Sequence, residues 1–327
     1  MQFFVLVLGL VVIIKSADIL IDSSSKIAHR YGVSTFIIGI TVIAFGTSAP
    51  ELAVGIISGI TRTNGLSLGN IIGSFMSNMA LIVGVASVII PLKIKESVLK
   101  RELPILFSVE ITLGAMMFLD GRLSRIEGFA LTALFILFMI YIVTDAKRKT
   151  ATESIVEVNE SGGEIEFDLE MRGTGKISQI SKLWLSCILA LSGLFLGGKI
   201  TVESSTKIAE SFGLSETLIG ITVVAIATTM PELITSIIAA RKKEHEIVLG
   251  NCIGSNIFNI LLVLGVSSAI TPIAVEGNLL FDFIVMISLT LFVFFVALFR
   301  KKIRRGVGIF LLAAYVSYLA VKVISAL

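Results

Sequence analysis

Apolar residues fill ten long segments of this chain, and short polar stretches separate them. The segments run over 2–22, 35–61, 66–90, 103–119, 126–145, 183–203, 215–240, 246–271, 279–299 and 306–325. A helix of about 20 apolar residues crosses the hydrocarbon core of a bilayer. The pattern therefore predicts an all-α polytopic membrane protein with ten transmembrane helices embedded in the lipid bilayer. The short alternating strands of a membrane barrel are absent from the sequence.

A long internal repeat divides these segments into two halves. Residues 22–91 and 203–272 align without a gap and are identical at 32 of 70 positions. Five segments lie in 1–145 and five in 183–327, and the polar stretch 146–182 joins them. An odd number of crossings inserts the second copy upside down, so we expect two inverted repeats. The joining stretch contains acidic residues and glycines without the ligand spacing of an EF-hand. We expect a flexible cytoplasmic tether there, with a regulatory Ca²⁺ or partner site as the alternative.

The basic residues predict the orientation of this bundle in the plasma membrane. If both termini face outside, the inner loops hold 20 of the 27 Lys and Arg residues. The richest of these loops are 93–101, 147–182 and 300–305. Because basic residues concentrate in cytoplasmic loops, the sequence predicts that the N-terminus and the C-terminus lie outside. The net charge of +3 follows from this placement and indicates no binding of nucleic acid.

Each repeat places one carboxylate beside hydroxyls and a proline within an apolar segment. In the first copy these are Thr47, Ser48 and Glu51, which lie on one side of a helix. Pro50 has no N–H to donate to the carbonyl of Gly46, and it pushes Ala49 away from helical angles. We therefore expect the helix to break here. The second copy repeats the arrangement with Thr228, Thr229, Pro231 and Glu232.

A second pair of polar positions follows in the next segment of each repeat. Ser74 and Asn78 are four residues apart on one helix face, as are Ser255 and Asn259. The glycines that precede them allow close helix approach and a second break, so we expect the second, third, seventh and eighth helices to be broken. For a single Ser or Asn, a role in helix packing alone is the alternative. Carboxylates at membrane depth are costly, however, and by default mark an ion or substrate site.

These groups together form an all-oxygen environment, which hard cations such as Ca²⁺ and Na⁺ prefer. Two carboxylates carry a charge of −2, which one Ca²⁺ neutralises. The sequence has two cysteines, Cys187 and Cys252, both in apolar segments, and no Cys or His spacing typical of a metal site. No serine has a base at useful spacing, so an intramembrane hydrolase is a poor fit. We expect a transporter that is not an enzyme and holds no cofactor.

The motifs Gly-Thr-Ser-Ala-Pro-Glu (46–51), Gly-Asn-Ile-Ile-Gly-Ser (69–74), Ala-Thr-Thr-Met-Pro-Glu (227–232) and Gly-Asn-Cys-Ile-Gly-Ser-Asn (250–256) resemble the α-repeats of the Na⁺/Ca²⁺ exchangers in the cation/Ca²⁺ antiporter superfamily. The resemblance implies antiport of Ca²⁺ against Na⁺ by alternating access, with the first and sixth helices sliding as the gate. It implies that Glu51 and Glu232 are the central ligands. Flanking oxygens would come from Thr47, Ser48, Ser74, Asn78, Thr228, Thr229, Ser255 and Asn259 and from the carbonyls of Ala44 and Ala225.

Asn259 bears on the subclass that the resemblance implies. K⁺-dependent members, and some archaeal exchangers, carry aspartate at this position, so the asparagine of this chain indicates a K⁺-independent exchanger. We also expect the protein to function as a monomer. Two alternatives remain open. The same glutamates could exchange Ca²⁺ against protons, and a Ca²⁺ channel, which the broken helices disfavour, would conduct without a counter-ion.

Overall fold

The computed structural model of the protein describes residues 2–61, 64–160, 174–211, 225–275 and 279–326. Eight of its described helices are long and apolar enough to cross a membrane, and a bent helix pair over residues 35–61 raises the number of spans to nine. The prediction of a helical polytopic membrane protein is confirmed. The predicted segment 215–240 is described only from residue 225 onward.

The helices follow the chain in an order close to the predicted one. The first half comprises α1 (Gln2–Tyr31), α2 (Thr35–Ile38), η1 (Gly39–Ile43), α3 (Ala44–Thr47), α4 (Ala49–Thr61), α5 (Asn64–Met76), η2 (Ser77–Ile82), α6 (Val83–Ile89), η3 (Val98–Glu102), α7 (Leu103–Asp120) and α8 (Arg125–Glu160). The second half comprises α9 (Thr174–Ser211), α11 (Ala225–Thr228), α12 (Met230–Arg241), α13 (His245–Phe258), η6 (Asn259–Leu264), α14 (Gly265–Ile270), α15 (Leu279–Arg300) and α16 (Arg305–Ala326).

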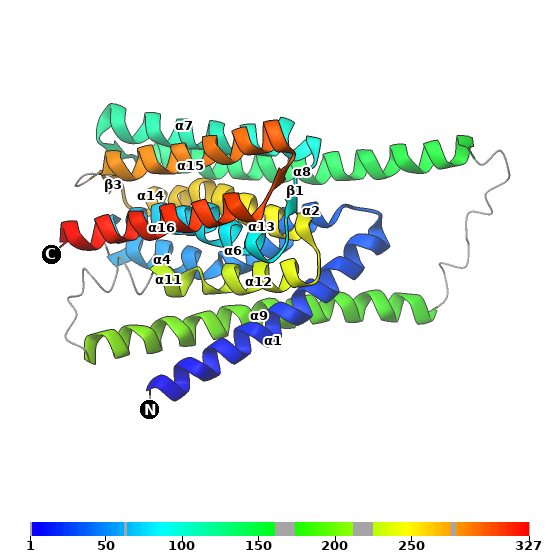
Figure 1. Cartoon of the computed structure of the whole chain (residues 1–327), viewed down its shortest axis with the longest axis horizontal. Helices are drawn as coiled ribbons and strands as arrows, with labels where there is room; N and C mark the ends of the chain where they lie inside the picture. Colours follow the sequence, from blue (N-terminus) through cyan, green and yellow to red (C-terminus); the bar gives the residue numbers. More distant parts are fainter. Residues whose placement is uncertain (1, 62–63, 161–173, 212–224, 276–278, 327) are drawn as a thin grey trace.

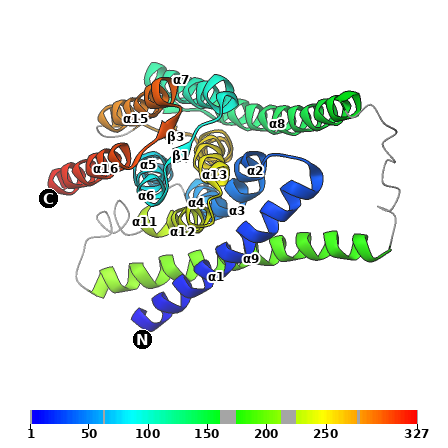
Figure 2. The same ribbon diagram turned by 45° about the vertical axis from the view of Figure 1, so that its right-hand side comes forward.

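The helices that carry the repeated motifs form the centre of the bundle. In Figure 2, α13, α3 and α4 lie in the middle, with α1 and α9 on one side and α7, α8 and α15 on the other. The span His245–Ile270 is 94% buried within the protein, and Leu68–Ile89 is 78% buried. Gly250 explains part of this close packing, because a Cβ there would lie 2.5 Å from the carbonyl oxygen of Phe36. Gly250 and Gly254, where a Cβ would lie 2.7 Å from Ala44, therefore let helices approach closely at the centre, whereas a Cβ on Gly69 would meet nothing within 4 Å.

Two of the four predicted helix breaks are present. The helix that contains Glu51 bends by 46° between Thr35–Thr47 and Ala49–Thr61. The break falls at Ser48, with φ −83° and ψ 7°, while Ala49 already belongs to the next helix. Thr229 has φ −83° and ψ 1° at the equivalent place between α11 and α12. Our expectation for Ala49 was wrong by one residue, because a proline in the first turn of a helix displaces no hydrogen bond.

The predicted breaks in the third and eighth segments are wrong. Each segment continues as one span, Leu68–Ile89 or His245–Ile270. Both contain a π-helical stretch instead, η2 in the first repeat and η6 in the second. Neither segment has an internal proline that would remove a helical hydrogen bond. A π-helical turn contains more residues than an α-helical turn, and it keeps the backbone hydrogen-bonded. Asn78 lies within η2 and Asn259 begins η6.

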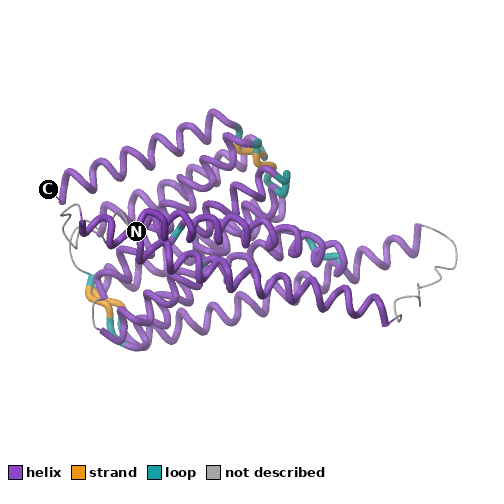
Figure 3. Tube along the Cα trace, turned by 90° about the horizontal axis from the view of Figure 1, so that it is seen from below, coloured by secondary structure: helices purple, strands orange, loops and turns teal. Residues whose placement is uncertain are grey.

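Four two-residue strands, which the hydropathy pattern did not predict, pair loops from different halves of the chain. β1 (Leu92–Lys93) pairs with β4 (Lys302–Ile303), and β2 (Arg122–Leu123) pairs with β3 (Ile273–Ala274), both antiparallel. The two pairs lie at opposite ends of the bundle (Figure 3). The N-terminus and the C-terminus lie toward the same end (Figure 1).

The stretch that joins the two halves is not a loop over its whole length. Helix α8 continues to Glu160 and α9 begins at Thr174, and both project beyond the bundle at one end (Figure 1). The expected loop is therefore helical over 146–160 and 174–182, and residues 161–173 lie outside the described part of the chain. Residues 147–160 contain no proline or glycine, so nothing in this sequence ends the helix.

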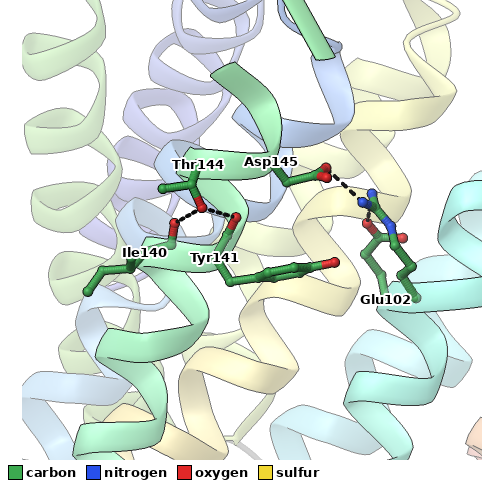
Figure 4. A network of polar contacts seen from close by, with 6 residues as sticks. Glu102, Ile140, Tyr141, Thr144 and Asp145 are labelled. Carbon is green, nitrogen blue, oxygen red and sulfur yellow. Dashed lines mark hydrogen bonds and ion pairs between the residues drawn. The ribbon is translucent and has the colours of Figure 1, made fainter. Parts of the chain in front are cut away.

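An ion-pair network lies where α8 leaves the bundle. The guanidinium of Arg101 donates to Asp145 at 2.7 Å and to Glu102 at 2.8 Å. Figure 4 shows the contacts of both carboxylates with this group as dashed lines, and Thr144 is the residue directly before Asp145. The hydroxyl of Thr144 donates to the carbonyl of Ile140 at 2.7 Å. This network fixes the start of α7 against α8.

Candidate cation-binding site

Glu51 and Glu232 occupy equivalent places in the two repeats. Each lies in the first turn of the helix that follows a break, α4 for Glu51 and α12 for Glu232. Their side chains are 0% and 1% exposed. The N-terminal end of a helix carries a partial positive charge and favours an anion. The two breaks thus present two helix N-termini to two buried carboxylates.

The two repeated motifs meet in space. A Cβ on Gly198 of α9 would lie 3.3 Å from the ring of Pro231 and 3.6 Å from the ring of Pro50. The hydroxyl of Ser48 donates to the carboxylate of Glu232 at 3.2 Å, which links the first motif to the second. Residues that are 181 positions apart in the sequence therefore build one site.

Hydroxyls from both motifs contact amides of the opposite repeat. Thr47 donates to the side-chain oxygen of Asn251 at 3.1 Å. Thr228 donates to the side-chain oxygen of Asn70 at 3.3 Å. The sequence analysis missed these two asparagines, although each lies four residues before a predicted serine, Ser74 or Ser255, on the same helix face. That spacing was the signal that could have identified them.

Several buried oxygens of the predicted site have no hydrogen-bond partner among the described residues. There are seven of these atoms: both carboxylate oxygens of Glu51, Oε2 of Glu232, the hydroxyls of Ser74 and Ser255, and Oδ1 of Asn78 and Asn259. Buried polar atoms in native proteins nearly always have a partner, which can be an ion or a water molecule. Ca²⁺ takes six to eight oxygen ligands. The site therefore supplies the number and kind of atoms that a hard cation requires.

The remaining predicted residues are buried nearby or begin short helices. Thr228 and Thr229 are 1% and 2% exposed, and Thr229 donates to the carbonyl of Ile226 at 3.1 Å. The carbonyl of Ala44 accepts the N–H of Ser48 at 3.0 Å and the hydroxyl of Thr47 at 3.4 Å, so a cation bound there would replace the longer of these two contacts. Ala225 is the first residue of α11.

Three further buried acids lie outside this site and were missed by the sequence analysis. Glu102 is 2% exposed and pairs with Arg101 at 2.8 Å. Glu110 of α7 is 0% exposed and accepts the hydroxyl of Thr290 at 2.6 Å. Asp282 of α15 is 3% exposed and pairs with Lys322 at 2.8 Å. These carboxylates have no repeated motif around them, so only the structure reveals that they are buried.

Comparison with known proteins agrees with this arrangement. A family model described as sodium/calcium exchanger protein matches residues 1–144 and 182–324. The chain belongs to this family. The matched ranges leave out nearly the same stretch, 145–181, that separates the two halves of the exchanger.

Relatives and solved structures of the family cover almost the whole exchanger chain. It is 33% identical to the sodium/calcium exchanger MaX1 of Methanosarcina acetivorans, over 98% of each chain. It is 33% identical to the inner membrane protein YrbG of Escherichia coli, over 96% of this chain and 94% of that protein. The solved structure of the sodium-calcium exchanger NCX_Mj soaked with Na⁺ superposes with a TM-score of 0.82 and 29% identity, over 98% of each chain.

Proposed function

We propose that this exchanger is a secondary active antiporter that carries Ca²⁺ in one direction and Na⁺ in the other. The observation that carries the proposal is the set of seven buried oxygens in the two repeated motifs, Glu51 and Glu232 included, that have no hydrogen-bond partner among the described residues. Their two carboxylates balance one Ca²⁺, and the same oxygens can instead hold Na⁺. Because the two loads compete for the same carboxylates, binding of one ion displaces the other, which is the coupling that an antiporter needs.

The paired strands support ten crossings. Paired loops must lie at one membrane surface, so an even number of crossings separates them. Between β1 and β4 the described residues contain five apolar spans, which is an odd number. A sixth crossing is therefore needed, and α11 and α12 are the helices that can belong to it. The two termini at one end of the bundle also require an even total (Figure 1).

The same strands support inverted repeats over 1–145 and 183–327, joined by 146–182. Adding 181 to the residue numbers of β1 gives those of β3, and the same shift relates β2 to β4 within one residue. Equivalent strands nevertheless lie at opposite ends of the bundle (Figure 3). This is the relation that a two-fold axis in the membrane plane produces. The basic loops support an orientation with both termini outside the plasma membrane.

Alternating access would come from α1 and α9, which cross along one side of the bundle (Figures 1 and 2). Small residues allow this pair to pack closely, since a Cβ on Gly197 would lie 2.8 Å from Ile13. The residue of α9 that lies beside Pro50 and Pro231 is also a glycine, Gly198. A helix pair with a small-residue face can slide past the site, which exposes it to one side at a time. The exchanger would do this as a monomer, because both halves of the site are in one chain.

The residue at 259 supports transport without K⁺. With asparagine at position 259 the site has two carboxylates, so the site lacks the third negative charge that a further monovalent cation would neutralise. The second candidate is exchange of Ca²⁺ for protons through the same glutamates, which carry no ion pair among the described residues. A channel is less favoured, since one buried site between two repeats is the arrangement of a carrier.

The test uses purified exchanger in liposomes loaded with Na⁺ and diluted into Na⁺-free buffer that contains ⁴⁵Ca²⁺. We expect uptake that requires internal Na⁺ and does not change when K⁺ is added. Uptake driven by a pH gradient without Na⁺ would support the proton exchanger. Uptake that continues without any counter-ion would indicate a channel, and both outcomes would overturn the proposal.

A further inference from the structure

The two asparagines that the sequence assigns to the candidate site are not held in the same way. The side-chain amide of Asn78 donates through Nδ2 to Oδ1 of Asn256 at 2.8 Å. Its own Oδ1 has no partner among the described residues. Asn259, the equivalent of Asn78 in the second repeat, has no described partner for either amide atom. All three side chains are at most 2% exposed.

The sequence explains this difference. Asn256 corresponds to position 75 under the shift of 181 residues, and position 75 holds phenylalanine. Phe75 is 1% exposed on α5, and α5 packs on η6, which begins with Asn259. In the other repeat α13, which carries Asn256, packs on η2, which contains Asn78. The packing is thus equivalent in the two repeats, but a phenylalanine ring cannot accept the amide N–H as Asn256 does.

A buried amide can face a cation with its oxygen or with its N–H₂ group, and only the oxygen binds. Because Nδ2 of Asn78 is already bonded to Asn256, its oxygen is the atom that remains for the ion. Asn259 has no such partner and can present either end. A ligand that is held in the binding orientation before the ion arrives binds more tightly than one that must first be ordered.

We propose that Asn256 is a positioning residue that fixes the oxygen of Asn78 toward the cation, and that Phe75 leaves Asn259 as a weak, unfixed ligand. The inference rests on the proposed function, because it concerns ligands of the same site. It predicts unequal contributions from two residues that the repeat makes equivalent. Partners that orient a metal-ligating side chain are typically worth about 10-fold to 100-fold in metal affinity.

A double-mutant cycle tests the first half of the proposal. The readout is equilibrium binding of ⁴⁵Ca²⁺ to the purified exchanger, with thermal unfolding as a check on folding. Asn256→Leu keeps the approximate volume but removes the acceptor, and we expect it to raise the Ca²⁺ Kd by about 10-fold. In the Asn78→Ala background the same change should have no further effect, since Asn256 acts through Asn78. A further 10-fold loss in that background would show that Asn256 acts through packing, and it would overturn the proposal.

A second comparison tests the role of Phe75. Asn259→Ala should change the Ca²⁺ Kd by less than about 3-fold in the native chain, but by about 10-fold in a Phe75→Asn background. Phe75→Leu is the matched control, because it also replaces the ring with a smaller side chain but offers no hydrogen-bond acceptor. An equally large effect of Asn259→Ala in all three backgrounds would contradict the inference. If Phe75→Asn does not fold, the cycle between Asn78 and Asn256 decides alone.

Failure of this inference is separable from failure of the proposed function. Binding of ⁴⁵Ca²⁺ reports the ligands whether or not the ion is exchanged for Na⁺. A native chain that binds Ca²⁺ but shows no Na⁺-driven uptake would refute the antiporter. The double-mutant cycle could still be measured by Ca²⁺ binding in that case. A native chain that exchanges normally while Asn256→Leu binds Ca²⁺ unchanged would refute the positioning role alone.

Discussion

Replacing either glutamate by glutamine should abolish Ca²⁺ exchange while the protein still folds. Glu51→Gln and Glu232→Gln each keep the shape of a side chain that is at most 1% exposed, and each removes one of two charges. A bound Ca²⁺ would then leave one positive charge uncompensated inside the bundle. Two unit charges about 4 Å apart interact by about 4 kcal/mol at an effective dielectric constant of about 20, and the double charge of Ca²⁺ doubles this interaction. Since about 1.4 kcal/mol corresponds to a tenfold change, we expect the Ca²⁺ affinity to fall by at least about a thousandfold.

The structure provides a matched control for these variants. Glu110 is also a buried carboxylate at membrane depth, 0% exposed, but it accepts a hydrogen bond from Thr290 and lies outside the site. Glu110→Gln should therefore leave the Ca²⁺ concentration for half-maximal uptake within about 3-fold of the native value. The assay is ⁴⁵Ca²⁺ uptake into Na⁺-loaded liposomes, with thermal unfolding of each variant measured in parallel. If Glu51→Gln reached half-maximal uptake at a Ca²⁺ concentration within tenfold of the native value, the assignment of the site would be refuted.

Three further variants test other parts of the structure. Gly198→Leu should reduce the rate of exchange by at least tenfold, because the side chain would enter the space beside both prolines, whereas the smaller Gly198→Ala should retain transport; uptake time courses distinguish them. Lys242→Gln removes ion pairs to Asp18 at 2.6 Å and Asp22 at 2.7 Å, which are half-exposed, so thermal unfolding should report a loss of at most about 1 kcal/mol. Asn259→Asp adds a third carboxylate, so Ca²⁺ uptake should become stimulated by K⁺; an unchanged response to K⁺ would contradict that reasoning.

The sequence predicted the helices and the two motifs that meet in the structure because both depend on strong local signals. Ten apolar segments and a gapless repeat are visible by hydropathy and alignment alone. Pro50 and Pro231 located two breaks to within a residue, since a missing N–H has a local effect wherever it occurs. The glutamates were identifiable because a carboxylate in an apolar segment is costly to bury and is therefore rare outside ion and substrate sites.

Other features depend on contacts between distant residues, and the sequence could not predict them. The two-residue strands are too short to show an alternating pattern, and each pairs with a loop from the other half of the chain. The π-helical turns η2 and η6 stand where breaks were predicted, and no proline within them marks their positions in the sequence. The bond between Asn78 and Asn256 spans 178 residues and has no counterpart at Phe75, so only the three-dimensional packing reveals it.

The central claim is that the two repeats build one cation site for competing ions. Equilibrium binding of ⁴⁵Ca²⁺ to the purified protein, with and without Na⁺, tests it most directly. We expect one Ca²⁺ per chain, complete displacement by Na⁺, and loss of all binding in both Glu51→Gln and Glu232→Gln. Two Ca²⁺ per chain, with each variant losing only one of them, would mean that each repeat holds its own ion and would contradict the composite site.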